Sequence, residues 1–166
     1  MIALEITSLK NFMNQLLAGD SFDSFLLEEA VISTANTYTI DGHINNDFFP
    51  LEERNREHIP YEFQSWSDIK GLCFNLIKGK HTPLFFKFVL HLKPEETAKL
   101  LTRYDCSVKS EQVKALVLNI RFDGSKACLT TGTSYHTFIM SKEADVIWDK
   151  ALVTFLTDKE IGFEEM

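Results

Sequence analysis

Nine residues from 84 to 92, LFFKFVLHL, alternate between a wholly apolar set and a mixed set. Successive side chains of a β-strand point to opposite faces, so this period of two predicts a strand with one fully buried face. The expected buried set is Leu84, Phe86, Phe88, Leu90 and Leu92. We expect the rest of the fold to be organised around this strand and the helix that precedes it.

The preceding segment, residues 67–78, is predicted to be that helix. Its apolar residues recur at i, i+3, i+4, i+7 and i+8, which places them on one helix face. They are Ile69, Leu72, Cys73, Leu76 and Ile77. Ser67 is the expected N-cap, Gly79 the expected stop, and Pro83 prevents continuation of the helix.

The same patterns locate the other regular elements. Helices are expected near 8–18, 94–104 and 142–157, with Tyr104 and Val146 among the inward-facing residues. Strands are expected at 2–6, 25–32, 38–40, 116–122, 127–133 and 135–140. The pair 116–122 and 127–133 is the clearest hairpin, because Asp123-Gly124 is a strong turn signal between two alternating runs.

The strand at 25–32 is less regular. Its odd positions Phe25, Leu27 and Val31 are expected on one face and its even apolar positions on the other. It forms either a hairpin with 38–40, turning near Ala35-Asn36, or two strands with one irregular step. A turn is expected at Asp41-Gly42.

Two segments lack periodicity. Residues 45–61 are charged and contain Pro50 and Pro60, which predicts a long exposed loop; such loops are often functional or disordered. The C-terminal residues GFEEM are expected to be frayed.

Together these elements predict an α+β fold in which helices cover a curved antiparallel sheet of six to eight strands. The element order falls into two strand–helix–strand–strand units, a first at about 1–44 and a second at 84–140 that adds one more strand. A length of 166 residues, 45% of them hydrophobic, fits a single domain over 1–166.

Composition limits the location and the chemistry. The N-terminal sequence lacks the pattern of a secretory signal, and no segment reaches the ~18 apolar residues of a membrane span, which predicts a cytoplasmic protein without a membrane partner. The three cysteines form no CxxC pair and the five histidines form no ligand motif, so we expect neither a disulfide framework nor a metal site. No cofactor motif is present.

Charge is distributed unevenly along the chain, whose net charge is −7. Residues 66–103 hold seven Lys or Arg against three Asp or Glu. Such a segment in an acidic protein is compatible with a local anion-binding face.

The best candidate site is the turn Lys78-Gly79-Lys80-His81, with Lys70 and Lys87 near it in sequence. The glycine permits a bend in which N–H and ammonium groups converge on a phosphate or carboxylate. The alternative is a solvated turn between two core elements, because lysines near a helix C-terminus are favourable in any case.

Lys99 and Arg103 form a second candidate, one helical turn apart on the polar side of the helix at 94–104. They are placed to contact a nucleic-acid backbone, although two charges alone neutralise few phosphates, and ordinary surface charge is the alternative. The run from Thr130 to His136 suggests sheet surface and not a catalytic pair, because no nucleophile-elbow pattern accompanies it. We identify no catalytic residue.

Two stretches carry a resemblance to a known family, CFNLIKGKHTPLFFKFVLHL at 73–92 and LNIRFDGSKACLTTGTSYHTF at 118–138. They resemble an uncharacterised family of clostridial and related Firmicute proteins that is labelled as a domain of unknown function. The resemblance covers nearly the whole chain and implies no activity.

A second similarity is topological. KFVLHLKPEETAKLL at 87–101, followed by ALVLNIRFDGSKACLTTGTSYHTFIMSKE at 115–143, is similar to the strand, helix and strand meander of a DNA sliding clamp domain. It implies a clamp-like fold with basic helices on one side. The chain departs from that pattern in its single domain, in a first helix whose one basic residue is Lys10, and in its added C-terminal helix, so ring closure is not implied.

Two functions remain open at this point. The first is a non-enzymatic binding or scaffolding protein, with a protein partner, self-association or nucleic acid as its target. The alternative is a small enzyme or ligand-binding protein that accepts an anionic small molecule at the Lys78–His81 turn, roofed by the loop 45–61.

Overall fold

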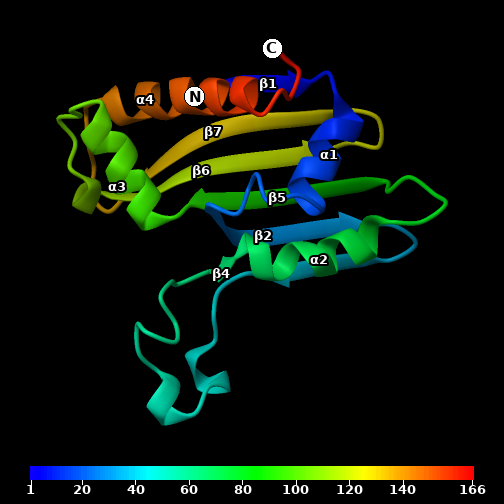
Figure 1. Cartoon of the computed structure of the whole chain (residues 1–166), viewed down its shortest axis with the longest axis horizontal. Helices are drawn as coiled ribbons and strands as arrows, with labels where there is room; N and C mark the ends of the chain where they lie inside the picture. Colours follow the sequence, from blue (N-terminus) through cyan, green and yellow to red (C-terminus); the bar gives the residue numbers. More distant parts are fainter.

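The computed structural model describes all residues from 1 to 166 and contains one eight-stranded sheet (Figure 1). The strands are β1 (Ala3–Ile6), β2 (Phe25–Ser33), β3 (Thr37–Asp41), β4 (Gln64–Ser65), β5 (Phe85–Leu92), β6 (Val113–Phe122), β7 (Ala127–Tyr135) and β8 (Phe163–Glu165). Their order across the sheet is β3-β2-β5-β6-β7-β1-β8, and β4 also pairs with β2. All pairs are antiparallel and the open sheet is curved, so the predicted α+β class is confirmed.

Four α-helices lie close to the predicted positions. They are α1 (Leu9–Leu17), α2 (Trp66–Ile77), α3 (Pro94–Arg103) and α4 (Glu143–Asp158). Three short 3-10 helices, η1 (Asn46–Phe48), η2 (Leu51–Glu53) and η3 (Ser110–Gln112), lie in the connections. None of the helices combines the length and the apolar character that crossing a membrane requires.

The strand–helix–strand–strand order occurs twice, as β1-α1-β2-β3 and β5-α3-β6-β7. In the second unit α3 joins neighbouring strands. In the first unit α1 carries the chain across β7, β6 and β5 before β2 begins. The two units therefore share one sheet, with the second unit inserted between the strands of the first.

One row of residues across the sheet shows where the core lies. Ala30, Phe88, Ile120, Leu129 and Leu4 are register partners on β2, β5, β6, β7 and β1, and each side chain is fully buried. The adjacent row points to the other face and contains Val31, Lys87, Arg121, Cys128 and Glu5, none of which is buried. The sheet thus has one covered face and one helix-free face, as alternation requires.

Two tryptophans fasten helices to the covered face. The Trp66 indole of α2 donates a hydrogen bond of 2.9 Å to the Leu16 carbonyl oxygen of α1 and packs 5.1 Å from the Phe88 ring. The Trp148 indole of α4 donates to the Val117 carbonyl oxygen of β6 at 2.8 Å. Both buried N–H groups are therefore satisfied, as expected for large aromatic residues in a core.

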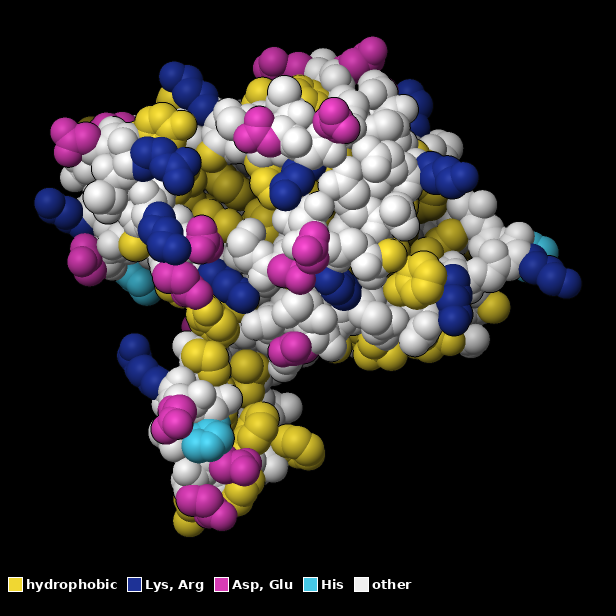
Figure 2. Space-filling model, in the orientation of Figure 1, with side chains coloured by type: hydrophobic (Ala, Val, Ile, Leu, Met, Phe, Trp, Pro, Cys, Tyr) yellow, Lys and Arg dark blue, Asp and Glu magenta, His cyan; other side chains and the backbone are white.

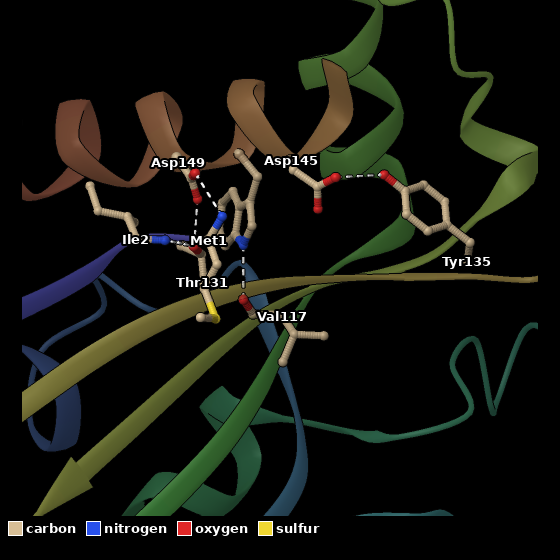
Figure 3. Close-up of polar contacts among 8 residues, drawn as sticks. Met1, Ile2, Val117, Thr131, Tyr135, Asp145 and Asp149 are labelled. Atoms are coloured by element: carbon tan, nitrogen blue, oxygen red, sulfur yellow. Dashed lines mark hydrogen bonds and ion pairs between the residues drawn. The ribbon is translucent and has the colours of Figure 1, made fainter. Parts of the chain in front are cut away.

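Polar contacts also hold α4 over β7 (Figure 3). The Thr131 hydroxyl donates to the Asp149 carboxylate and accepts from the Ile2 backbone N–H at 2.9 Å. The amino group of Met1 lies 3.2 Å from Asp149. One helical turn earlier, Asp145 accepts a hydrogen bond of 3.2 Å from Tyr135.

Two predictions for the part of the chain after β7 are wrong. Residues 136–140 form no strand, because β7 ends at Tyr135 and the chain turns toward α4. The tail is not frayed: Phe163, Glu164 and Glu165 pair with β1 as β8. A three-residue strand carries too little periodicity to be recognised in the sequence, whereas the unpaired edge of β1 favours it in the fold.

Several side chains face differently from the prediction. Leu84, Leu72, Tyr104 and Val146 are exposed. Leu84 lies before the first residue of β5, Tyr104 follows the last residue of α3, and Leu72 and Val146 lie on the solvent side of α2 and α4. Helix α2 begins at Trp66 with Ser65 as its N-cap, earlier than the expected Ser67, and its buried residues are Trp66 and Cys73.

The predicted assignment of residues to the two faces of β2 is also wrong. Its core residues are Phe25, Leu27, Ala30 and Ile32, so the apolar phase shifts between Leu27 and Ala30. A β-bulge between Leu27 and Glu29 causes the shift, because one extra residue changes the face of every later side chain. The irregular step that the sequence left open is present within β2, which also forms the hairpin with β3.

Candidate functional site

Residues 44–63 leave the edge of the sheet between β3 and β4 and form a projecting arm, drawn in cyan to green in Figure 1. His43 and Phe63 pair as an isolated antiparallel bridge at its neck, and the Ile44 N–H donates to the Glu62 carbonyl oxygen at 2.9 Å. No turn occurs at Asp41-Gly42, contrary to prediction, because β3 runs directly into this neck. The arm is mostly exposed and contains η1 and η2.

The base of the arm is tied to the start of α3. The Tyr61 hydroxyl donates a hydrogen bond to the Glu95 carboxylate, and Lys93 Nζ lies 5.5 Å from the Tyr61 ring centroid. The bond to Glu95, with burial, raises the pKa of Tyr61 to about 12. Burial acts to raise the pKa of Glu95, but the Tyr61 hydrogen bond, a backbone N–H and nearby lysines together lower it.

A cleft of about 710 Å³ lies between the arm and the adjacent end of the sheet, and we call it the arm cleft. Its ionisable lining residues are His43, Arg54, Arg56, Tyr61, Glu62, His91, Lys114 and His136. Its volume is within the range of small-molecule sites, roughly 300–1,000 Å³. Figure 2 shows basic or histidine side chains on both the arm and the body beside the space between them.

The floor of the arm cleft is built on the bulge in β2. The bulge turns Glu28 toward β5, where its carboxylate oxygen lies 3.1 Å from His91 Nε2. The His91 side chain is almost fully buried, and the Phe63 ring packs edge-on against it at 5.0 Å. Glu28 and Phe63 thus fix the orientation of His91 from two sides.

A second irregularity places a cation at the same cleft. The register of β6 against β7 shifts between Val113 and Ala115, and Lys114 is the residue at the shift. Bulges often re-aim one side chain out of the regular alternation beside functional sites. Here two separate bulges contribute Glu28 and Lys114 to one region.

Not every cation in the arm cleft is free. Arg54 donates to the Phe49 carbonyl oxygen at 2.8 Å and to the Asp47 carbonyl oxygen at 3.4 Å, so it holds the arm together. The side chains of Arg56, Lys114 and His136 make no hydrogen bond or ion pair. Glu62 is the one acidic lining residue, and it lies 3.6 Å from His43.

The chemistry that this arrangement offers is anion recognition. Guanidinium, ammonium and imidazole groups on three separate segments face one hollow, and such groups form charge-assisted hydrogen bonds with carboxylate or phosphate oxygens. The histidines do not converge: no group of three His, Cys, Asp or Glu is close enough to hold a metal ion.

The residues predicted from the basic segment lie elsewhere. Lys78, Lys80 and His81 precede β5, whereas the arm cleft lies at the end of β5. Eight residues of strand separate the two places, which is roughly 25 Å at about 3.3 Å per residue. The loop and the basic turn therefore do not form one pocket.

The other predicted residues are dispersed as well. Lys70 is engaged by the Gly19 carbonyl oxygen at 2.6 Å and by Asp23 at 2.7 Å. Lys87 lies on the helix-free face of the sheet, 3.1 Å from Glu29. Lys99 lies 3.4 Å from Glu96 and shares with Arg103 a small hollow of about 180 Å³ beside α4.

Sequence reasoning missed Arg56, Lys114 and His136 as a group. They belong to the arm, to β6 and to the segment after β7, so no local motif joins them. The sequence did contain one signal, a break in the spacing of two between buried residues of a strand. In β2, Ala30 follows Leu27 by three positions, and in β6, Leu116 follows Ala115 directly. Such breaks mark bulges, and both bulges adjoin this cleft.

Residues 15–164 match the model of a protein family described as a family of unknown function, DUF5721. The chain belongs to the DUF5721 family. No curated protein and no solved structure matches this DUF5721 chain. The family description assigns no activity.

Proposed function

We propose that this chain is a non-enzymatic binding protein that holds an anionic group in the arm cleft. The observation that carries this proposal is the arrangement of Arg56, Lys114 and His136, three unpaired groups from three segments that line one hollow with a single acid, Glu62.

The charges of these unpaired groups are opposite in sign to the net charge of the protein. In a chain with a net charge of −7, an unpaired arginine and lysine facing one concave surface create a local field that opposes the overall charge. A concave surface with low-dielectric walls strengthens such a field. The arm cleft therefore attracts anions although the protein as a whole repels them.

The chemical class follows from the donors. The arm cleft presents a planar guanidinium, an ammonium and imidazole groups, and Glu62 is its one acidic residue, which suits a carboxylate or a phosphate as the ligand. Either a small anion or an acidic segment of a partner protein can supply this group. The apolar residues Leu26, Ile59 and Phe63 in the lining would contact the uncharged part of the ligand.

Calorimetric titration with two probes, inorganic pyrophosphate and a short polyglutamate peptide, tests the proposal. We expect at least one probe to bind, and we expect the double variant Arg56→Glu/Lys114→Glu to weaken that binding by at least about tenfold. The matched control is Lys109→Glu/Lys142→Glu, which changes the charge equally at two exposed lysines outside the arm cleft.

The pattern across the probes identifies the source of the anion. Binding of pyrophosphate alone points to a small phosphate ligand, whereas binding of the peptide alone points to an acidic protein segment. If neither probe binds, or if both double variants weaken binding equally, the arm cleft is not the binding site. The thermal midpoint of each variant should stay near that of the original chain, because exposed charges contribute little to stability.

Nucleic-acid binding in the manner of a sliding clamp is the second candidate. The repeated strand–helix–strand–strand order and the placement of the helices over one sheet face favour it. The scattered positions of Lys70, Lys99 and Arg103 support it less, since each phosphate contact adds to affinity only when several act together. Salt-sensitive binding of double-stranded DNA that is lost on Lys99→Glu/Arg103→Glu would favour this candidate over the arm cleft.

A further inference from the structure

We propose that the tip of the arm of one copy binds the groove between α1 and α2 of a second copy, so that the chain self-associates. This interaction goes beyond anion binding in the arm cleft and uses different residues. It also gives the basic turn at Lys78–His81 a role that the arm cleft does not.

The tip of the arm, residues 46–53, is apolar and acidic at once. Phe48 is 84% exposed and Leu51 is 77% exposed, although both belong to ordered 3-10 turns. The Phe48 ring packs edge-on against Phe49 at 5.4 Å, which holds it outward. The tip also carries three acids, Asp47, Glu52 and Glu53. Asp47 lies 3.9 Å from Arg54, so Glu52 and Glu53 are the acids of the tip without an ion-pair partner.

The groove between α1 and α2 has the complementary character. It has a volume of about 940 Å³, and its apolar lining includes Leu9, Met13 and Phe74, the last of which is 40% exposed. Lys10 and Lys78 are its charged residues, and no acid lines it. We call it the helix groove.

The helix groove continues toward the basic turn. An adjoining hollow of about 360 Å³ shares Leu9, Lys10 and Lys78 with it and extends to Lys80 and His81, again without an acidic residue. In Figure 2, hydrophobic side chains and Lys or Arg side chains lie side by side over the right-hand end of α2. An apolar floor with a cationic rim matches an apolar tip that carries the unpaired acids Glu52 and Glu53.

The arm of the same chain does not fill its own groove. The contacts at the neck and the Tyr61–Glu95 hydrogen bond fix the direction in which the arm leaves the sheet. Figure 1 shows the tip of the arm pointing away from the body, on the side where α2 begins. The helix groove is lined by Phe74 and Ile77, near the C-terminal end of α2. No residue of the arm lines the groove or its extension.

A second copy is therefore the occupant that the charges select. Each chain carries one arm and one groove, so two chains can exchange arms reciprocally and form a closed pair. Burial of Phe48 and Leu51 supplies the apolar contribution, and the pairing of acids with lysines sets the orientation.

Sedimentation analysis of the chain of residues 1–166 over a range of concentrations tests the proposal. We expect concentration-dependent association that weakens as salt rises, because part of the interface is ionic. The tip variant Phe48→Ser/Leu51→Ser and the groove variant Lys78→Glu/Lys80→Glu should each weaken association by at least about tenfold. Lys109→Glu/Lys142→Glu is the matched control and should leave association unchanged.

A charge exchange gives the sharpest result. The variant Glu52→Lys/Glu53→Lys and the variant Lys78→Glu/Lys80→Glu should each remain monomeric alone and should associate when mixed. A chain that stays monomeric at every accessible concentration would overturn the proposal, as would association that survives both the tip and the groove variants. Arg56→Glu/Lys114→Glu should still self-associate, so failure of the arm-cleft proposal and failure of this one are distinguishable.

Discussion

A β-carbon on Gly42 would lie 1.8 Å from the carbonyl oxygen of Leu27. At this point the neck of the arm passes directly over the bulge of β2: the Gly42 N–H donates to the Glu28 carbonyl oxygen and its own carbonyl accepts from the Gln64 N–H, both at 2.8 Å. The close approach joins the origin of the arm to the bulge that turns Glu28 toward His91. One glycine therefore supports both the arm and the floor of the arm cleft.

The first prediction concerns this position. Gly42→Ala should destabilise the protein by about 2 kcal/mol or more, because the backbone of Leu27 must shift to admit a methyl group. Gly71→Ala is the matched control: Gly71 lies within α2, a β-carbon there would meet no atom within 4 Å, and alanine should stabilise by about 0.5–1 kcal/mol. Urea denaturation measures both changes, and equal effects at the two glycines would contradict the close approach.

The second prediction concerns the tether between Tyr61 and Glu95. Tyr61→Phe removes the hydroxyl that bonds Glu95, so the base of the arm should open more often. Trypsin should then cleave after Arg54 and Arg56 several-fold faster than in the original chain. Tyr104→Phe, at an exposed tyrosine that caps the C-terminus of α3, should leave the cleavage rate unchanged.

The third prediction is a pH dependence. The hydrogen bond to Glu95 raises the pKa of Tyr61 to about 12, and burial followed by the Asp145 charge raises the pKa of Tyr135 to about 12. Both phenols ionise near 10 in the unfolded chain, so their stabilising contribution is complete below pH 10 and is lost as pH rises toward 12. Chemical denaturation at a series of alkaline pH values should show this loss, and Tyr61→Phe/Tyr135→Phe should flatten it.

The fourth prediction concerns the different reactivity of Cys73 and Cys128 toward a thiol reagent. Cys73 is fully buried on the inner side of α2, and burial raises its pKa to about 12, so its thiolate is both scarce and shielded. Cys128 lies on the helix-free face of the sheet and is partly exposed. A thiol reagent should modify Cys128 in the folded protein and Cys73 only on unfolding, as mass spectrometry of digested samples would show; early modification of Cys73 would contradict the packing of α2.

The sequence predicted those elements whose periodicity spans several turns or a whole strand. The apolar stripe of α1 and the alternation of Phe86, Phe88 and Leu90 each repeat often enough to identify the element and its buried face. β8 was missed because three residues show no period, and its formation depends on the free edge of β1, which lies at the other end of the chain.

The candidate site was predicted less well for a physical reason. The sequence indicated that the segment at 45–61 was exposed, and the arm is mostly exposed. One of the two open functions made this segment the roof of a pocket at the Lys78–His81 turn, whereas the arm lines a cleft at the other end of β5 that does not include the turn. The sequence did not place Arg56, Lys114 and His136 together, because their proximity depends on the order of strands in the sheet and on two bulges. Lys70 and Lys87 are near each other in sequence but lie on opposite sides of the sheet. Lys70 belongs to α2 on the covered face, whereas the alternation of side chains along β5 places Lys87 on the helix-free face.

The most direct test of anion binding in the arm cleft is an NMR titration of the five histidine rings with the better-binding probe, pyrophosphate or the polyglutamate peptide, at constant pH. His43, His91 and His136 line the arm cleft, whereas His81 lies before the other end of β5, so the chain contains its own control. The His58 ring contacts Asn55, a lining residue, and does not serve as a control. We expect saturable shifts of the three lining rings, a smaller or no shift of His81, and loss of the response in Arg56→Glu/Lys114→Glu. Shifts centred on His81, or no saturable shift of the lining rings, would contradict anion binding in the arm cleft.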